Sequence, residues 1–74
     1  GYLTLKTVNP SSAAVFLGKT ELGSTPFVKM PIEAGIDELR IVDSDSKNRS
    51  YTVTITSGKT EEKTVNVGSL PLGP

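Results

Sequence analysis

Apolar and polar residues alternate along several short stretches of this chain. Residues 51–56 read Tyr-Thr-Val-Thr-Ile-Thr, so apolar side chains take every second position and threonines take the positions between them. The same period of two recurs in 2–8, in 36–42 and in 65–67. Such a period places one row of side chains in a core and the other in water, which is the pattern of an antiparallel sheet with one buried face.

Glycines, prolines and polar runs separate these stretches at intervals of roughly 5–10 residues, which is typical of an all-β sandwich or barrel. Glycine or proline interrupts every helical repeat of apolar residues. We therefore predict an all-β fold, a small antiparallel β-sandwich of about seven short strands with no helix longer than one turn. The predicted strands span 2–8, 13–18, 20–23, 27–31, 36–42, 50–57 and 60–67.

The last residues of the chain differ in composition from the rest. Residues 68–74 contain two prolines and two glycines and carry no alternating pattern. Chain ends of this kind are poorly ordered unless contacts hold them down. We therefore expect a domain over 1–67 and an extended or disordered tail or linker over 68–74.

One predicted strand, 13–18, has an ambiguous buried face. Either Val15 and Leu17 or Ala14 and Phe16 could point inward, and we favour Val15 and Leu17. Phe16 is then exposed, as the alternation also predicts for Tyr2. We expect Tyr2 and Phe16 to form an outward pair on neighbouring strands, a candidate interaction surface because aromatic residues are enriched in interfaces.

The stretch 22–27 combines residues that shape a corner. Gly23 permits a bulge or a close backbone crossing, and Thr25 can hydrogen-bond locally through its hydroxyl. Pro26 begins a strand that cannot donate from its first position, so we expect that strand at a sheet edge. We interpret Gly23, Thr25, Pro26 and the later Gly35 as residues that specify the fold rather than a binding site.

Composition and charge exclude several classes of function. The chain contains no cysteine, histidine or tryptophan, and its eight basic residues balance eight acidic ones. Without cysteine there is no disulfide or thiolate site, and without histidine there is no imidazole ligand or serine–histidine dyad. The zero net charge argues against nucleic acid. No apolar run approaches the ~20 residues of a membrane span, so we expect no membrane insertion of these residues.

The acidic residues do not form a recognisable site. The run 43–48 superficially resembles a calcium loop, but Lys47 takes a ligand position, and the sixth position lacks glycine and the twelfth lacks glutamate. Paired acids such as Glu61 and Glu62 would need a deep cleft for acid–base catalysis, which a core this small does not provide. We therefore predict no catalytic residue, no metal site and no cofactor.

Several of these motifs together resemble the PEGA domain family. The most specific is the stretch 22–27, which is similar to the family's apolar-Gly-Thr-Thr-Pro-apolar pattern. The resemblance covers about residues 1–67 of the chain. Other similar segments are Gly1-Tyr2-Leu3-Thr4-Leu5, Asn9-Pro10, Ala13-Ala14-Val15-Phe16-Leu17, Pro31-Ile32-Glu33-Ala34-Gly35, Leu39-Arg40-Ile41, Gly58-Lys59-Thr60 and Val65-Asn66-Val67.

Three positions depart from the family pattern. The hairpin at Gly18-Lys19 lacks the usual Asp-Gly or Asn-Gly, which leaves its turn type open. The turn that names the family reads Glu-Ala-Gly, although Gly35 still supplies a special backbone angle. Asp37 replaces an aromatic residue or histidine and shares a face with Leu39, so its carboxylate must be paired, capped by backbone N–H groups or near the rim.

The resemblance implies a noncatalytic accessory module of a larger bacterial signalling or cell-envelope protein, for example beside a Ser/Thr kinase. We expect it to recognise a partner protein through a sheet edge or an exposed face. A binder of cell-wall polysaccharide or peptidoglycan through Tyr2 and Phe16 is the alternative, as is a structural spacer or self-association domain. The resemblance favours a periplasmic or cell-surface location over the cytoplasm.

Overall fold

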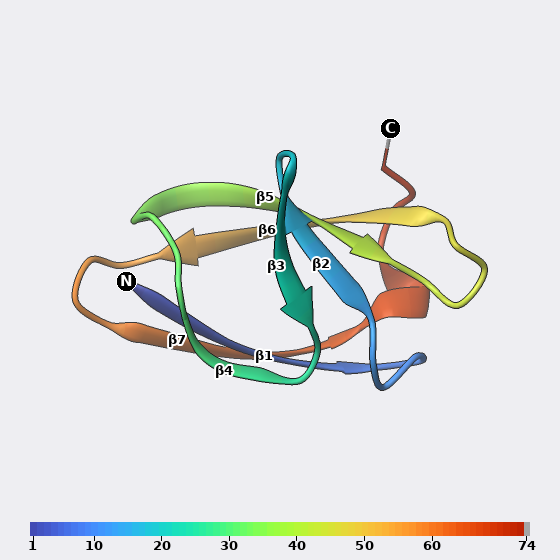
Figure 1. The fold of residues 1–74 in the computed structure, drawn as a ribbon, viewed down its shortest axis with the longest axis horizontal. Helices are drawn as coiled ribbons and strands as arrows, with labels where there is room; N and C mark the ends of the chain where they lie inside the picture. Colours follow the sequence, from blue (N-terminus) through green and yellow to red (C-terminus); the bar gives the residue numbers. More distant parts are fainter. Residues whose placement is uncertain (74) are drawn as a thin grey trace.

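A computed structural model describes residues 1–73 and shows two β-sheets packed face to face (Figure 1). Each of the seven predicted strands is confirmed, with ends that differ by at most two residues. Helical structure in the described residues is limited to one short 3₁₀ turn. The elements are β1 Tyr2–Val8, β2 Ala14–Leu17, β3 Thr20–Ser24, β4 Phe27–Pro31, β5 Gly35–Val42, β6 Asn48–Ile55, β7 Thr60–Asn66 and η1 Val67–Ser69.

One sheet has the order β4-β1-β7 and the other has the order β3-β2-β5-β6. The predicted all-β sandwich is therefore confirmed. Antiparallel pairing holds for β1–β4, β2–β3, β2–β5 and β5–β6, whereas β1 and β7 run parallel over seven residue pairs. Ser57-Gly58-Lys59 between the last two strands predicts a hairpin, but the segment 56–59 carries the chain from β6 across to β7 in the other sheet, so this prediction is wrong. Alternation shows which face of a strand is buried but not the direction of the strand beside it. The sequence therefore could not reveal that β7 runs parallel to β1.

The inner faces of the two sheets enclose one apolar cluster. The inward residues that the alternation predicts are confirmed in it: Leu3, Leu5, Leu39, Ile41, Val53, Ile55, Val65 and Val67. Val15 is fully buried and Leu17 packs against the cluster, so the favoured face of β2 is confirmed as well. The buried apolar residues are Leu3, Leu5, Ala13, Val15, Ile32, Leu39, Ile41, Val53, Ile55, Val65 and Val67.

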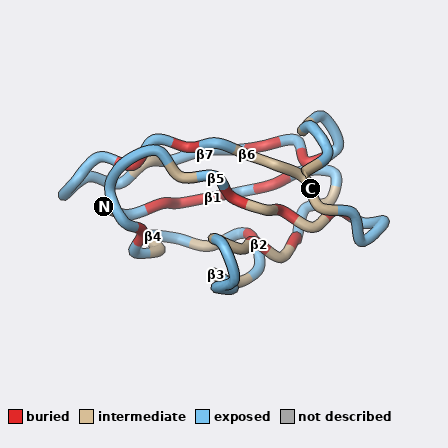
Figure 2. The backbone as a smooth tube through the Cα atoms, turned by 90° about the horizontal axis from the view of Figure 1, so that it is seen from above, coloured by how far each residue is buried: buried red, intermediate tan, exposed pale blue. Residues whose placement is uncertain are grey.

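The four edge strands lie in pairs along the two long sides of the sandwich. Figure 2 shows β6 and β7 along one side and β3 and β4 along the other. The strand that follows Pro26 is β4, and its predicted place at a sheet edge is confirmed. The two sides differ in how their edges are covered.

The chain after β7 turns back onto the four-stranded sheet. Val67 begins η1 and is buried, and Leu70 packs against the core cluster. Leu72 then forms an antiparallel bridge with Arg49 of β6. Residues 70–73 of the predicted tail or linker, which we call the tail segment, are extended and pair with the edge of β6. Pro74, the last residue of that predicted linker, lies outside the described residues.

Candidate functional site

The edge of β6 is the longest regular edge among the strands that the structure describes. β6 pairs with β5 over eight consecutive residues without a bulge. The backbone N–H of Ser50 donates to the Pro71 carbonyl at 2.9 Å and that of Gly73 donates to the Asn48 carbonyl at 2.8 Å. Both bonds lie on the side of β6 opposite β5, so the backbone groups of even-numbered β6 residues face the outer edge.

Beyond Ser50 this outer edge has no backbone partner among residues 1–73. Alternation directs the N–H and C=O groups of Thr52 and Thr54 away from β5, and the side chains of both threonines are exposed. We call residues 51–55 of β6 the open edge. Its residues are Tyr51, Thr52, Val53, Thr54 and Ile55, none of them charged at neutral pH and none of them proline. Edges of this kind are templates for pairing with another strand.

The other three sheet edges carry features that discourage pairing. β3 contains a bulge, since Val15 pairs with Gly23 and Phe16 pairs with Glu21, which leaves Leu22 as an extra residue. β4 is irregular around Lys29, which has a positive φ of 53°, and the strand ends at a proline. β7 carries two glutamates and a lysine in succession at 61–63. Bulges, proline and charge are the usual protections of an edge, and the open edge lacks all three.

The inner side of the open edge packs on the core. Tyr51, Val53 and Ile55 point inward, and Tyr51 stays half-buried. Burial, together with the negative charge of Glu61 on β7, raises the pKa of the Tyr51 phenol. Tyr51 therefore remains neutral at physiological pH, and the open edge presents backbone groups and threonine hydroxyls rather than charge.

Arg49 fastens the tail segment beside the open edge. Its Nη1 donates to the Leu70 carbonyl at 2.7 Å, and its Nε donates to Asp43 Oδ2 at 2.9 Å. Asp43 Oδ1 accepts from the backbone N–H groups of Asp45 and Lys47, both at 2.9 Å. Asp43 therefore organises the loop between β5 and β6 and also orients the arginine that holds the tail.

These hydrogen bonds favour the ionised form of Asp43. The backbone N–H of Lys47 and the side chain of Arg49 lower the pKa of the carboxyl below its ordinary value, against the opposing effect of desolvation. The run 43–48, considered in the sequence as a poor calcium loop, is thus a turn closed by its own first carboxylate. The described residues contain no group of three acidic, histidine or cysteine side chains that could hold a metal ion.

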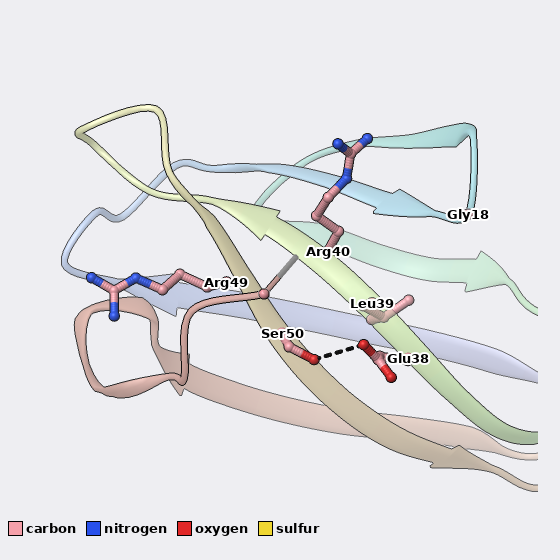
Figure 3. Close-up of a pocket in the computed structure, with 7 residues that line it drawn as sticks. Gly18, Glu38, Leu39, Arg40, Arg49 and Ser50 are labelled. Atoms are coloured by element: carbon pink, nitrogen blue, oxygen red, sulfur yellow. Dashed lines mark hydrogen bonds between the residues drawn. The ribbon is translucent and has the colours of Figure 1, made fainter.

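A hollow of about 190 Å³ lies next to the tail segment on the four-stranded sheet. Figure 3 shows its lining residues, among them Glu38, Ser50 and Arg40. The Ser50 hydroxyl donates to Glu38 Oε1 at 3.0 Å, whereas Arg40 lies over the Phe16 ring, 4.4 Å from its centroid. The hollow is open, and Ser50 and Glu38 within it already bond to each other.

The predicted outward pair of aromatic residues does not form. Tyr2 lies on β1 of the three-stranded sheet and Phe16 lies on β2 of the four-stranded sheet. Tyr2 is 43 % exposed, and Phe16 is half-buried beneath Arg40. The prediction that they occupy neighbouring strands is therefore wrong, because alternation along a strand does not reveal which sheet the strand joins.

Of the four residues interpreted as specifying the fold, Gly23, Thr25 and Pro26 lie together from the end of β3 to the start of β4, whereas Gly35 begins β5. Thr25 is 2 % exposed, and its hydroxyl lies 2.6 Å from that of Thr7 and accepts from the Ala13 N–H at 2.9 Å. Gly23 has a φ of 131°, which side chains disfavour, and it adjoins the bulge in β3. Pro26 comes directly after Thr25 and is exposed. These contacts connect β1, the residue before β2 and the link between β3 and β4.

The positions that depart from the expected pattern are also resolved. Gly18 has a φ of 61° at the first of two turn residues, the geometry of a type II′ hairpin, which explains why Gly precedes Lys19. Gly35 has a φ of 127° at the start of β5. Asp37 is half-buried, and its Oδ2 has no hydrogen-bond partner in the described part of the chain. This oxygen is therefore neither paired with another side chain nor capped by a backbone N–H group, which are two of the three environments expected for Asp37.

The model of one family, the PEGA domain, matches residues 2–70. The chain belongs to the PEGA domain family. No curated protein and no solved structure gives a significant match. PEGA domains are accessory modules, and the match covers the whole sandwich up to Leu70, the first residue of the tail segment. No helix within residues 1–73 is long and apolar enough to cross a membrane.

Sequence reasoning missed the open edge and the docked tail segment of this PEGA domain. The alternation predicts the threonines of 52–56 as a solvated row, and the lack of charge in that row was the available signal for the open edge. The apolar residues Leu70 and Leu72 were the signal for a docked tail. Neither signal specifies a partner, because pairing at an edge depends on which segments the fold brings together.

Proposed function

We propose that this PEGA domain is a noncatalytic protein-interaction module of a larger bacterial signalling or cell-envelope protein. Its partner supplies an extended segment that adds to the four-stranded sheet at the open edge of β6. The single observation that carries the proposal is the regular, uncharged stretch 51–55, whose side opposite β5 has no neighbouring strand among residues 1–73. Strand addition of this kind draws affinity from main-chain hydrogen bonds and selectivity from alternate side chains.

The tail segment supports strand addition at this place. It is itself a short extended piece that pairs antiparallel with β6 through two backbone hydrogen bonds. The same edge therefore accepts a peptide backbone next to the position where the partner would pair. The charges and bulges of the other three edges give no comparable support to β3, β4 or β7.

The chemistry of the open edge restricts the partner segment. Side chains directly opposite Thr52 and Thr54 lie on the outer, solvated face, so small polar or β-branched residues suit these positions. Residues opposite Tyr51 and Val53 lie toward the core side, where apolar side chains suit the positions. The best partner is thus an extended segment with its own alternation and no proline in its centre.

The alternative as a cell-wall polysaccharide binder has less support. It required Tyr2 and Phe16 on one surface, but the two rings lie in different sheets.

Self-association through two open edges uses the same main-chain chemistry as the proposal. Sedimentation of the unmodified chain over a range of concentrations distinguishes it, since pairing between copies makes the apparent mass rise with concentration.

A displayed library of random twelve-residue peptides tests the proposal. Selected peptides are measured against the whole chain and against Thr54→Pro, which removes an N–H that faces away from β5. We expect at least a tenfold loss of affinity in Thr54→Pro. Thr54→Val is the matched control, because it keeps the N–H and replaces the hydroxyl with a methyl group, and it should bind within about twofold of wild type.

The fold of both variants is checked by the amide spectrum of the core residues. Equal peptide affinity in wild type and Thr54→Pro contradicts strand addition at this edge. A library that yields no binding peptide also counts against the proposal.

A further inference from the structure

We infer that the tail segment, residues 70–73, is a built-in competitor that occupies part of the β6 edge until a partner strand displaces it. This inference rests on the proposed function and concerns the regulation of the same site. It follows from where the tail segment pairs, from how it is held and from what its departure would expose.

The tail segment and a partner strand require the same position beside β6. The free stretch 51–55 spans about 16 Å, at 3.3 Å per residue. A partner of more than about five residues extends along β6 into the stretch 48–50. Pro71 and Gly73 already occupy that position, because they bond to Ser50 and Asn48. A longer partner strand and the docked tail segment therefore exclude each other.

The tail segment is held by few contacts beyond Leu70. Leu70 packs on the core, but Leu72 is 60 % exposed and buries little apolar surface. The remaining contacts are the two backbone bonds to β6 and the Arg49 side chain on the Leu70 carbonyl. Residues 71–73 can therefore leave the edge without disturbing the apolar cluster, while Leu70 stays in place.

Departure of residues 71–73 doubles the set of outward-facing residues available to a partner. The open edge offers the backbone groups of Thr52 and Thr54, and the released edge adds the Asn48 carbonyl and the Ser50 N–H. Arg49 keeps its bond to Asp43 when the tail moves. The loop 43–47 therefore remains formed, and the enlarged edge has the same shape as the occupied one.

A substitution at Gly73 can release the tail segment without removing any residue, and a second substitution there is its control. Gly73→Pro deletes the N–H that donates to Asn48, and Gly73→Ala keeps it. A Cβ at Gly73 would lie 3.7 Å from its nearest neighbours in Ser50, which is ordinary contact, so the alanine side chain fits the docked tail segment. In Gly73→Pro the ring carbon on the nitrogen replaces the hydrogen that points at the Asn48 carbonyl, so the docked position is disfavoured. We expect the selected twelve-residue peptides to bind Gly73→Pro about fivefold or more tightly than wild type, and Gly73→Ala within about twofold of it.

The opposite experiment uses a disulfide to hold the tail segment in its docked position on β6. Arg49 and Leu72 form a pair without mutual backbone hydrogen bonds, in which Cα atoms lie about 4.5 Å apart, close enough for a disulfide. The double variant Arg49→Cys/Leu72→Cys contains the sole cysteines of the chain. Its reduced form is the control for its oxidised form, and we expect oxidation to weaken peptide binding by fivefold or more.

The outcomes separate this inference from the proposed function. Tighter binding in Gly73→Pro together with weaker binding in the oxidised double variant supports the competitor. Equal binding in all tail variants, with binding still lost in Thr54→Pro, overturns the competitor and leaves strand addition intact. Absence of peptide binding in every form, including Gly73→Pro, overturns the proposed function and this inference with it.

Discussion

The two long sides of the sandwich are closed in different ways. Along the β3–β4 side, a bulge, an irregular strand and the buried hydroxyl of Thr25 connect the sheets into a fixed corner. Along the β6–β7 side, the edge of β6 is straight, and the tail segment covers half of it through two backbone bonds and one arginine.

The two sides therefore differ in the free energy that is needed to open them. The corner buries polar groups that must stay paired, so opening it is costly. The tail segment covers backbone groups that water can also satisfy, so moving it costs little. The two sides of this accessory domain thus differ in how much it costs to open them, and the following changes test that contrast.

The largest expected effect is at the corner. Thr25→Val keeps the volume of the side chain but leaves the Ala13 N–H buried without a partner and removes the bond to Thr7. We expect a loss of about 1–3 kcal/mol in the free energy of unfolding. Urea denaturation measures it. Thr25→Ser, which keeps the hydroxyl, should lose less, and an equal loss in both variants would show that the hydroxyl is not what holds this side.

A smaller effect is expected where the tail is fastened. Arg49→Met removes the bonds to the Leu70 carbonyl and to Asp43 but keeps a long apolar side chain. We expect about 1 kcal/mol of destabilisation, because Asp43 keeps its two backbone donors. Hydrogen exchange should quicken at the amides of Ser50 and Gly73 more than at core amides.

Arg49→Lys is the control for this change, since it keeps the charge but has no planar group to span both acceptors. It should free the tail amides to an intermediate extent. A uniform increase of exchange over the whole chain would mean that Arg49 supports the entire fold rather than the tail.

The smallest effect is a pH dependence from Asp43. The pKa of this carboxyl is lower in the folded chain than its ordinary value, so the unfolded chain binds the proton more readily. The stabilisation is therefore fully present above about pH 5, one unit above the ordinary pKa, and is lost as the pH falls through the lowered pKa. The stability difference between wild type and Asp43→Asn should shrink between pH 5 and pH 2 (about 3 units around the ordinary pKa). A difference that stays constant over this range contradicts the assignment.

The sequence by itself determined the strands, most of their buried faces and the hairpin at Gly18. Alternation around Leu39 and Val53 defines local structure, because there each side chain faces the core or the solvent according to its parity. In β1 parity alone fails, because Leu3, Thr4 and Leu5 are all buried. Gly18 and Gly35 mark the places where the backbone takes a positive φ, a demand that a single residue satisfies. These features depend on neighbours in the chain, so they can be read from it.

Only the tertiary structure decided the pairing of the strands and the position of the tail. The same alternation allows β7 to run parallel to β1, allows Tyr2 and Phe16 to lie in different sheets, and leaves the edge of β6 open. Pairing is a contact between distant segments, and its energy comes from the packing of whole faces rather than from local preference. The candidate site belongs to this second class, because an edge exists only after the sheets are assembled.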